Sequence, residues 1–400
     1  MEILMISRCP PYPVHDGDRL IPGHLGRELN KKMHSVDLLA FYQRASDLAD
    51  VPFYERSFNS VQLFREPRRS RLSYRQRVSR ADARFPTRAE GSWSPEMWNA
   101  VQDILSTRTY DVIHLFGGVQ VYEYRHLVRD IPNIIVPYES YSLWMDRAVD
   151  EEQNFLLRQG KKAMRRMARS FESWMFEGYD RVVVLADRDA RTLRELNPET
   201  PAVVIPNGVD TEYFTPTGYE STEPTLVFTG NYDYGPNLDA ALRLAHDIFP
   251  RIHQKVPQSR LYIIGKNPPP QLLACASDSI EVTGFVPDLR PYFEQSLIFI
   301  SPLRLGAGLK NKVLEAMAMQ CPVVATPLSC DGIPVRQGQH VLLGNSDDDL
   351  VNAVFRLFKD KQLRRDIAQN GRILIERHFT WQRVAEMYED LYLQVMDERG

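Results

Sequence analysis

Short, continuous runs of apolar residues recur along the chain, and each is followed by a segment of helical length. Valine, isoleucine and leucine runs without polar alternation are typical of parallel strands that are buried on both faces. In the first half we predict strands at Ile3–Ile6, Val36–Phe41, Val112–Leu115, Ile134–Pro137 and Val182–Leu185. In the second half we predict them at Val203–Ile205, Thr225–Thr229, Leu261–Ile264, Ile280–Thr283, Ile298–Ser301 and Val323–Ala325. Two such sets predict an α/β fold with two doubly wound parallel-sheet domains.

The boundary between these domains is expected where prolines concentrate, in the segment NPETPAVVIP at residues 197–206. We therefore predict a first domain over residues 1–197 and a second over residues 198–380. A last helix, about residues 381–400, follows the second domain, and packing back on the first domain is one arrangement open to it. Ligands bind doubly wound sheets at the carboxyl ends of the strands, so the expected site is an interdomain cleft.

Composition narrows the class of protein. The chain is 43% hydrophobic and 25% charged with a net charge of −3, which argues against nucleic acid as a partner. Four cysteines form no CxxC pair, so neither a disulfide framework nor a zinc site is indicated, and a reducing cytoplasm fits best. The N-terminus lacks the features of a signal peptide, and no run of about 18 apolar residues is present that could span a bilayer.

Basic residues gather at two places in the first half. Nine arginines lie between Arg65 and Arg88, against two acidic residues. Further basic residues recur at helical spacing from Arg158 to Arg169, with apolar residues roughly opposite them. Two interpretations stay open: a solvated helix face over an ordinary core, or a surface that meets anionic lipid head groups.

The segment SPLRLGAGLKNKVLEAMAMQ, from Ser301 to Gln320, carries the strongest chemical signal. A strand breaks into glycines, then a helix begins near Leu309, and glycines allow close backbone approach while the first helical amides point at an anion. Lys312 and Glu315 lie on neighbouring parts of the helix surface. Lys310 joins them only if it belongs to the turn before the helix. The alternative is an exposed first turn with an idle ion pair.

This segment resembles the signature of family 4 glycosyltransferases, which have the GT-B fold of two facing Rossmann-like domains. Further segments resemble the same family in the same order: PPYPVHDGDRLIPGHL (10–25), IPNGVDTEYF (205–214), FTGNYDYGPNLDA (228–240) and TGFVPDLRPYF (283–293). The form is closest to sugar transferases associated with exopolysaccharide clusters.

The resemblance implies roles for individual residues. Glu315 matches the glutamate that binds the donor's ribose, whereas the family's first glutamate falls on Ala307 and is absent. A branch with GxGxKxK here uses lysines, matching Lys310 and Lys312. The family's arginine and lysine in the first loop of the second domain fall on Asn231 and Asn237, which are uncharged. The implied donor-binding residues are Gly17, Gly230, Asn231, Gly265, Val286, Gly306, Ala307, Gly308, Leu309 and Glu315.

Catalytic roles are expected for Lys310, Lys312 and His114, the last because the family often carries a histidine at that strand end; a structural histidine is the alternative. Arg19, His24 and Glu139 are expected at the acceptor, with surface or capping roles as alternatives. Asp16-Gly17-Asp18 has the letters of a metal motif but matches the glycine loop better, so no metal and no cofactor are expected.

The resulting hypothesis is a retaining glycosyltransferase that uses a nucleoside-diphosphate sugar and a glycan or lipid-linked acceptor, cytoplasmic and peripheral at the membrane. Fixed cations would stabilise the charge that builds up on the departing diphosphate. A sugar-nucleotide epimerase or hydrolase, and a non-catalytic partner subunit, stay open as alternatives. A nicotinamide dehydrogenase is disfavoured because no GxGxxG follows the first strand.

Overall fold

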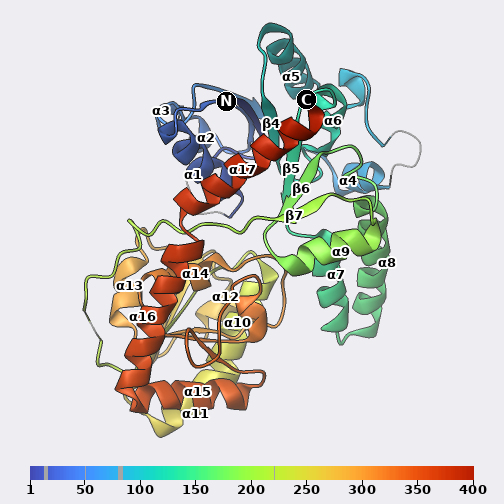
Figure 1. Cartoon of the computed structure of the whole chain (residues 1–400). Coiled ribbons are helices and arrows are strands. Elements are labelled where there is room, and N and C mark those ends of the chain that lie inside the picture. The colour runs from blue at the N-terminus through green and yellow to red at the C-terminus, as the bar shows by residue number, and fades with distance from the viewer. Residues whose placement is uncertain (13–16, 50, 80–83, 220) are drawn as a thin grey trace. The chain divides into compact units, whose positions relative to one another are not determined.

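The computed structural model describes residues 1–12, 17–49, 51–79, 84–219 and 221–400. The chain forms two compact units (Figure 1). The first consists of Met1–Asn207 together with Trp381–Gly400, and the second of Gly208–Thr380. Each unit contains its own parallel sheet, so the predicted fold of two doubly wound α/β domains is confirmed.

The first unit is built on a seven-stranded sheet in the order β3-β2-β1-β4-β5-β6-β7, with parallel pairing throughout. Residues Ile3–Ile6 of β1 and Val182–Val184 of β6 are buried, as expected of strands covered on both faces. Sequence reasoning did not find β3, since this edge strand is only half-buried and has no apolar run. The strands are β1 Glu2–Ser7, β2 Ser35–Tyr42, β3 Ser60–Arg65, β4 Val112–Phe116, β5 Asn133–Tyr138, β6 Arg181–Val184 and β7 Ala202–Val204.

Helices of the first unit begin at side-chain caps that satisfy their free amides. Ser94, Ser140 and Asn154 accept hydrogen bonds from the third residue of α5, α7 and α8, respectively. The helices are α1 Gly17–Lys31, α2 Ser46–Ala49, α3 Val51–Tyr54, α4 Arg71–Val78, α5 Pro95–Thr107, α6 Arg125–Val128, α7 Tyr141–Asp150, α8 Phe155–Glu172, α9 Asp187–Leu196 and α17 Trp381–Arg399, with 3₁₀ turns at Ala89–Gly91 and Tyr122–Tyr124.

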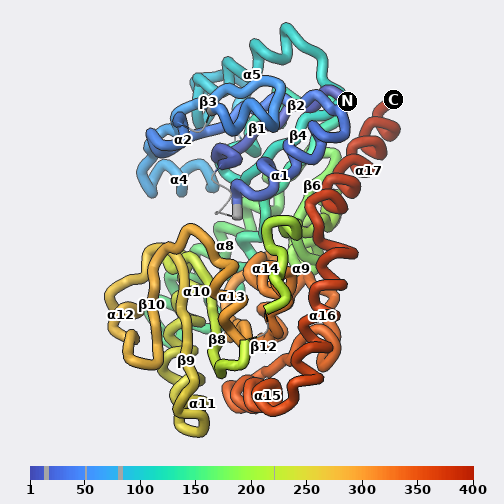
Figure 2. The backbone as a smooth tube through the Cα atoms, turned by 90° about the vertical axis from the view of Figure 1, so that its left-hand side faces the viewer, coloured from blue at the N-terminus to red at the C-terminus, as the bar shows by residue number. Residues whose placement is uncertain are grey.

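The predicted domain boundary requires correction. The units divide after Asn207 rather than between residues 197 and 198, because β7 pairs with β6 and therefore belongs to the first sheet. The proline-rich segment is thus partly a strand rather than a linker. The chain also returns to the first unit at its end, where α17 packs along α1 (Figures 1 and 2).

The second unit is built on a six-stranded parallel sheet in the order β10-β9-β8-β11-β12-β13, and Figure 2 shows β10, β9 and β8 following one another across it. The strands are β8 Thr225–Asn231, β9 Arg260–Lys266, β10 Ile280–Gly284, β11 Ile298–Ser301, β12 Val323–Ala325 and β13 Leu342–Leu343. The helices are α10 Gly235–Arg243, a π-helical turn Leu244–Ile248, α11 Phe249–Lys255, α12 Pro270–Leu273, α13 Arg290–Gln295, α14 Asn311–Ala318, a 3₁₀ turn Pro327–Cys330, α15 Asp347–Lys359 and α16 Lys361–His378.

None of the helices in the described ranges is both long enough and apolar enough to cross a bilayer.

Candidate functional site

The strand order of the second sheet marks one place where a ligand is expected. From β8 the chain proceeds outward through β9 and β10, then returns to the other side of β8 with β11, β12 and β13. The order therefore reverses between β8 and β11, which pair directly. In doubly wound sheets the crevice at the carboxyl ends of such neighbours binds ligands. Here the loops after these two strands lead into α10 and α14.

The connection from β11 to α14 has the backbone that its glycines allow. Gly306 has a φ of 108° and Gly308 a φ of 67°, both in the left-handed region that favours glycine. A Cβ atom on Gly306 would also lie 3.2 Å from the hydroxyl of Tyr234 in the β8–α10 loop. The two loops therefore approach each other closely at this point.

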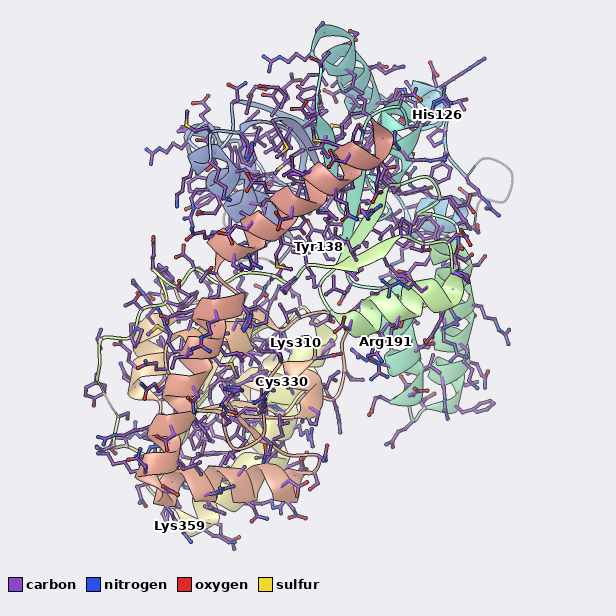
Figure 3. The ribbon with its side chains drawn as sticks, viewed as in Figure 1. His126, Tyr138, Arg191, Lys310, Cys330 and Lys359 are labelled. Atoms are coloured by element: carbon purple, nitrogen blue, oxygen red, sulfur yellow. The ribbon has the colours of Figure 1, made fainter. Side chains whose placement is uncertain are left out.

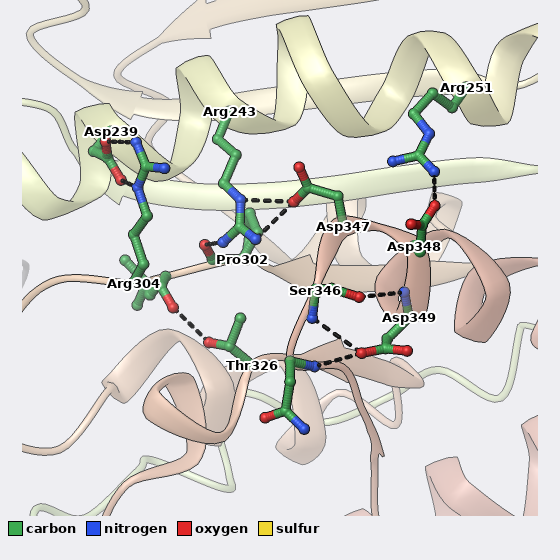
Figure 4. A network of polar contacts seen from close by, with 12 residues as sticks. Asp239, Arg243, Arg251, Pro302, Arg304, Thr326, Ser346, Asp347, Asp348 and Asp349 are labelled. Atoms are coloured by element: carbon green, nitrogen blue, oxygen red, sulfur yellow. Dashed lines mark hydrogen bonds and ion pairs between the residues drawn. The ribbon is translucent and has the colours of Figure 1, made fainter. Parts of the chain in front are cut away.

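Polar contacts hold the strand side of this connection (Figure 4). Arg243 donates to the carbonyl of Pro302 at 2.8 Å, and Arg304 forms a two-pronged ion pair with Asp239 at 2.7 and 2.8 Å. Thr326 donates its hydroxyl to the carbonyl of Leu303 at 2.6 Å. The glycine turn is thus attached to α10 and to the segment after β12, which limits how far it can move.

Lys310 is the N-cap residue of α14 and has non-helical dihedral angles, so it belongs to the turn before the helix. Only from this position was Lys310 expected to join Lys312 and Glu315. Its ammonium group donates to the carbonyl of Ala307 at 2.6 Å and to the carbonyl of Gly308. The side chain is 7% exposed (labelled in Figure 3). Lys310 therefore folds back over the glycine turn and stabilises it, and its positive charge stays beside the first amides of α14.

Lys312 connects the two loops. Its Nζ donates to Oδ1 of Asn237 at 2.6 Å and lies 4.4 Å from the centroid of the Phe228 ring, and Asn237 in turn donates to the carbonyl of Asn231 at 2.9 Å. Burial lowers the pKa of Lys312 to about 7, an effect that Glu315 opposes and Lys310 reinforces. Because burial disfavours the charged form of Lys312, an anion bound beside it would stabilise that form strongly.

Glu315 lies one helical turn beyond Lys312. Burial raises the pKa of Glu315 to about 7, and the charge of Lys312 opposes this rise. The two groups therefore titrate as a coupled pair close to neutral pH. Ala307, where the family's first glutamate is absent, is 5% exposed and Leu309 is also buried, so this part of the turn is apolar.

Two glycines at strand ends, Gly230 and Gly265, lie at a point of close backbone packing. Gly230 and Gly265 pair in register across β8 and β9, and a Cβ on Gly265 would lie 1.6 Å from the carbonyl oxygen of Gly230. Gly265 also has a φ of 148°. Val286 follows β10 and is half-buried. The predicted contacts of these residues with a donor stay predictions.

Arg19 and His24 of the first unit have partners within that unit. Arg19 is buried and forms an ion pair with Asp47 at 3.1 Å, and it also donates to the carbonyl of Tyr12. The His24 ring stacks on Trp381 with centroids 4.6 Å apart. These contacts stabilise the surroundings of α1, and the predicted acceptor contacts stay untested beside them. Gly17, predicted to meet the donor, begins α1, while residues 13–16 of the same glycine loop lie outside the described residues.

The catalytic role predicted for His114 does not fit its position. Its side chain is fully buried in β4, its Nδ1 lies 2.6 Å from the hydroxyl of Tyr392, and its ring packs against Phe116 and Tyr388. Burial lowers the pKa of His114 well below its usual value, so the ring is neutral. Tyr388 and Tyr392 belong to α17, so His114 seats this helix on the sheet, as the structural alternative supposed.

Sequence reasoning missed Arg8, which lies at the reversal of strand order in the first sheet, between β1 and β4. Arg8 pairs with Asp18, and its guanidinium lies 5.4 Å from the centroid of the Tyr138 ring at the end of β5. Burial lowers the pKa of Arg8, but the charges of Asp18, Tyr138 and Cys9 together with the hydrogen bond to Asp18 outweigh this and raise the pKa overall. Glu139, predicted at the acceptor, directly follows Tyr138. A cation immediately after the first strand, in the sequence MISRC, was the available signal.

Among the described residues, no group of three or more histidine, cysteine, aspartate or glutamate side chains is arranged to hold a metal ion. The four cysteines are free thiols.

Comparison with known proteins matches both units. Residues 23–213 match the family described as Glycosyltransferase Family 4, and residues 223–360 match the one described as Glycosyl transferases group 1. An uncharacterised 44.6 kDa protein in the cps region of Klebsiella pneumoniae is 20% identical over 395 residues, which cover 96% of this chain and 97% of that protein.

Two solved structures resemble the whole chain. Sucrose-phosphate synthase from Thermosynechococcus elongatus has a TM-score of 0.74 at 17% identity, with 100% of both chains covered. The Anabaena protein HepE, solved in complex with UDP and glucose, has a TM-score of 0.69 at 14% identity, with 98% of this chain and 100% of that chain covered. At such low identities these likenesses show the fold, which is GT-B.

Proposed function

Because the chain belongs to glycosyltransferase family 4, we propose that it transfers a sugar from a nucleoside-diphosphate sugar to a hydroxyl group of a glycan or lipid-linked glycan. The observation that carries this proposal is the start of α14 beside the strand-order reversal of the second sheet. There the ammonium groups of Lys310 and Lys312 lie beside the glycine turn and the N-terminus of the helix, whose dipole adds positive charge. HepE, which shares the fold, was solved with UDP and glucose.

This arrangement suits the departure of a diphosphate. As the bond from the anomeric carbon to the diphosphate oxygen breaks, negative charge accumulates on that oxygen. Cations and amides already held in place stabilise this charge more in the transition state than in the ground state. We propose that Lys312, helped by Lys310 and the amides of α14, supplies this stabilisation, and that Glu315 accepts hydrogen bonds from the donor's ribose. We propose further that the reaction retains the anomeric configuration, with the acceptor attacking on the face that the diphosphate leaves, and that it needs no resident metal.

We also propose a place of action. A lipid-linked acceptor and the basic residues of the first unit favour the inner face of the cell membrane, with the enzyme bound peripherally. Free thiols suit a reducing cytoplasm. Domain roles follow from the same reasoning: acceptor binding in the first unit and donor binding in the second.

The proposal is tested by ligand binding and turnover. Thermal shift of the full chain against UDP-glucose, UDP-N-acetylglucosamine, GDP-mannose and the free nucleotides should reveal one preferred donor. Lys312→Ala should then weaken donor binding and lower kcat/KM by about ten- to a hundredfold, since a charge-assisted hydrogen bond contributes about 1.5–3 kcal/mol. Lys359→Ala is the matched control, because Lys359 is exposed and lies far from Lys310 within the same unit (Figure 3).

Each outcome separates the alternatives. Nucleoside diphosphate released only in the presence of an acceptor supports transfer. Free sugar released without any acceptor indicates a hydrolase, a converted sugar nucleotide indicates an epimerase, and nucleotide binding without turnover indicates a non-catalytic subunit. Equal kinetics for Lys312→Ala and Lys359→Ala would reject the assigned role of Lys312.

A further inference from the structure

The α7–α8 hairpin of the first unit presents an unusual set of exposed side chains. The two helices run side by side away from the sheet (Figure 1). The first residues of α8 are three large apolar side chains, Phe155, Leu156 and Leu157, which are 69%, 78% and 59% exposed. Exposure of three consecutive apolar side chains to water is unfavourable, and their transfer into an apolar phase would lower the free energy.

Basic residues of α8 divide into two groups. Some are paired with acids of α7 or of the turn that follows it: Lys161 lies 2.6 Å from Glu152, and Arg169 lies 3.2 Å from Asp146. Arg165 also reaches Asp146, at 3.7 Å. These pairs join α8 to α7 and to the turn between them and neutralise three of its cations.

The second group forms an unneutralised stripe. Within the part of the chain that the structure describes, Arg158, Lys162 and Arg166 make no ion pair. Positions 155, 158, 162 and 166 advance by three, four and four residues, so Phe155 and these three cations share one face of the helix. α8 itself contains only one acid, the buried Glu172 at its end, and the other acids of the hairpin lie in α7 and the following turn, at Asp146, Asp150, Glu151 and Glu152.

We propose that this stripe docks the protein on an anionic lipid bilayer, with Phe155, Leu156 and Leu157 inserted between head groups and acyl chains. A row of cations attracts the negative surface of such a membrane, and adjacent apolar side chains enter its interface. α4, which carries the exposed Arg71, Leu72 and Arg75, lies against α8 and extends the basic surface. This inference rests on the proposed place of action at a membrane and adds the residues and the mode of attachment.

Flotation of the full chain with vesicles tests it. Vesicles of phosphatidylcholine with phosphatidylglycerol should carry the protein, vesicles of phosphatidylcholine alone should not, and rising salt should progressively weaken the binding. Changing Phe155, Leu156 and Leu157 together to Gln should reduce partitioning at least tenfold and leave the remainder fully salt-sensitive. Arg158→Gln, Lys162→Gln and Arg166→Gln together should abolish binding. A control with the same loss of charge is Arg44→Gln, Arg56→Gln and Lys359→Gln, all exposed.

Insertion itself has a spectroscopic signature. Tryptophan fluorescence of a Phe155→Trp variant should shift to the blue on anionic vesicles and be quenched by lipids brominated in the acyl chain. Unchanged partitioning of the apolar variant, equal losses in the control, or a hairpin variant that changes oligomeric state instead of vesicle binding would overturn the proposal. Donor-induced thermal shift, measured on every variant, keeps this failure distinct from failure of the proposed function, because hairpin variants should retain it.

Discussion

At the scale of single residues, the candidate site depends on Lys312, whose charged form is disfavoured by burial. Lys312 is buried beside Phe228 and Asn237, and its pKa falls to about 7. Lys312 is therefore only partly charged at neutral pH in the free protein. A bound diphosphate would restore its charge, since an opposite charge close by favours the ionised form. Donor binding should thus be linked to uptake of a proton.

This linkage predicts a pH dependence with a defined sign. Above the pKa of about 7 in the free protein, donor affinity should fall as pH rises, by up to about tenfold per pH unit, because the neutral amine must first be protonated. The measurement is calorimetric titration with the preferred sugar nucleotide from pH 6 to about pH 9, where the diphosphate charge is constant.

Lys312→Arg provides the control, since a guanidinium stays charged throughout this range. Its affinity should not vary with pH in the same window. An identical slope in this variant would assign the dependence to another group, Glu315 being the nearest.

At the scale of elements, the site is a product of how strands end and helices begin. β8 and β9 approach each other closely where Gly230 pairs with Gly265, and the connection from β11 to α14 turns at Gly306 and Gly308. The backbone thus reaches conformations and distances that side chains would forbid, and α14 begins directly after this turn.

Gly265→Ala should be strongly destabilising. The new Cβ would lie 1.6 Å from a backbone oxygen at a φ of 148°, so the strands must separate, with an expected loss of about 3 kcal/mol or more. Urea denaturation measures the loss. Gly235→Ala at the start of α10, where nothing lies within 4 Å, should change stability by less than about 1 kcal/mol. Similar values for the two variants would contradict the close approach.

At the scale of the whole molecule, the first unit is built from two separate parts of the chain. After completing the second unit it returns to the first, where α17 buries Trp381, Val384, Tyr388, Tyr392 and Val395. Since each large apolar side chain contributes about 1.5–3 kcal/mol when buried, their sum is comparable with the whole stability of a typical domain.

Ending the chain after Thr380 should therefore unfold or loosen the first unit while the second stays folded. Hydrogen exchange should show lost protection in α1, β1 and β4, and unchanged protection in β8 and β11. Tyr392→Phe, which keeps the helix but removes the hydrogen bond to His114, should cost only about 1 kcal/mol. Equal loss of protection in both units would contradict this division of the chain.

Much of this was predictable because it is encoded locally. Apolar runs located ten of the thirteen strands of the described chain in their correct units, and the glycine-to-helix segment located the turn with Lys310 and Lys312. The half-buried edge strand β3 and the two-residue β13 lack an apolar run, and β7 was assigned to the wrong unit because the prolines beside it resemble a linker.

The sequence alone was enough to predict the fold class, to reveal the resemblance to family 4 glycosyltransferases and to locate the glycine-to-helix junction at the start of α14, because hydrophobic period, glycines and helix signals act over a few residues. Three contacts became visible only in the folded chain: Lys312 with Asn237, His114 with Tyr392, and His24 with Trp381. These pairs join residues 75, 278 and more than 300 positions apart, and such contacts depend on how strands are ordered in a sheet and where the last helix packs. No local pattern carries that information.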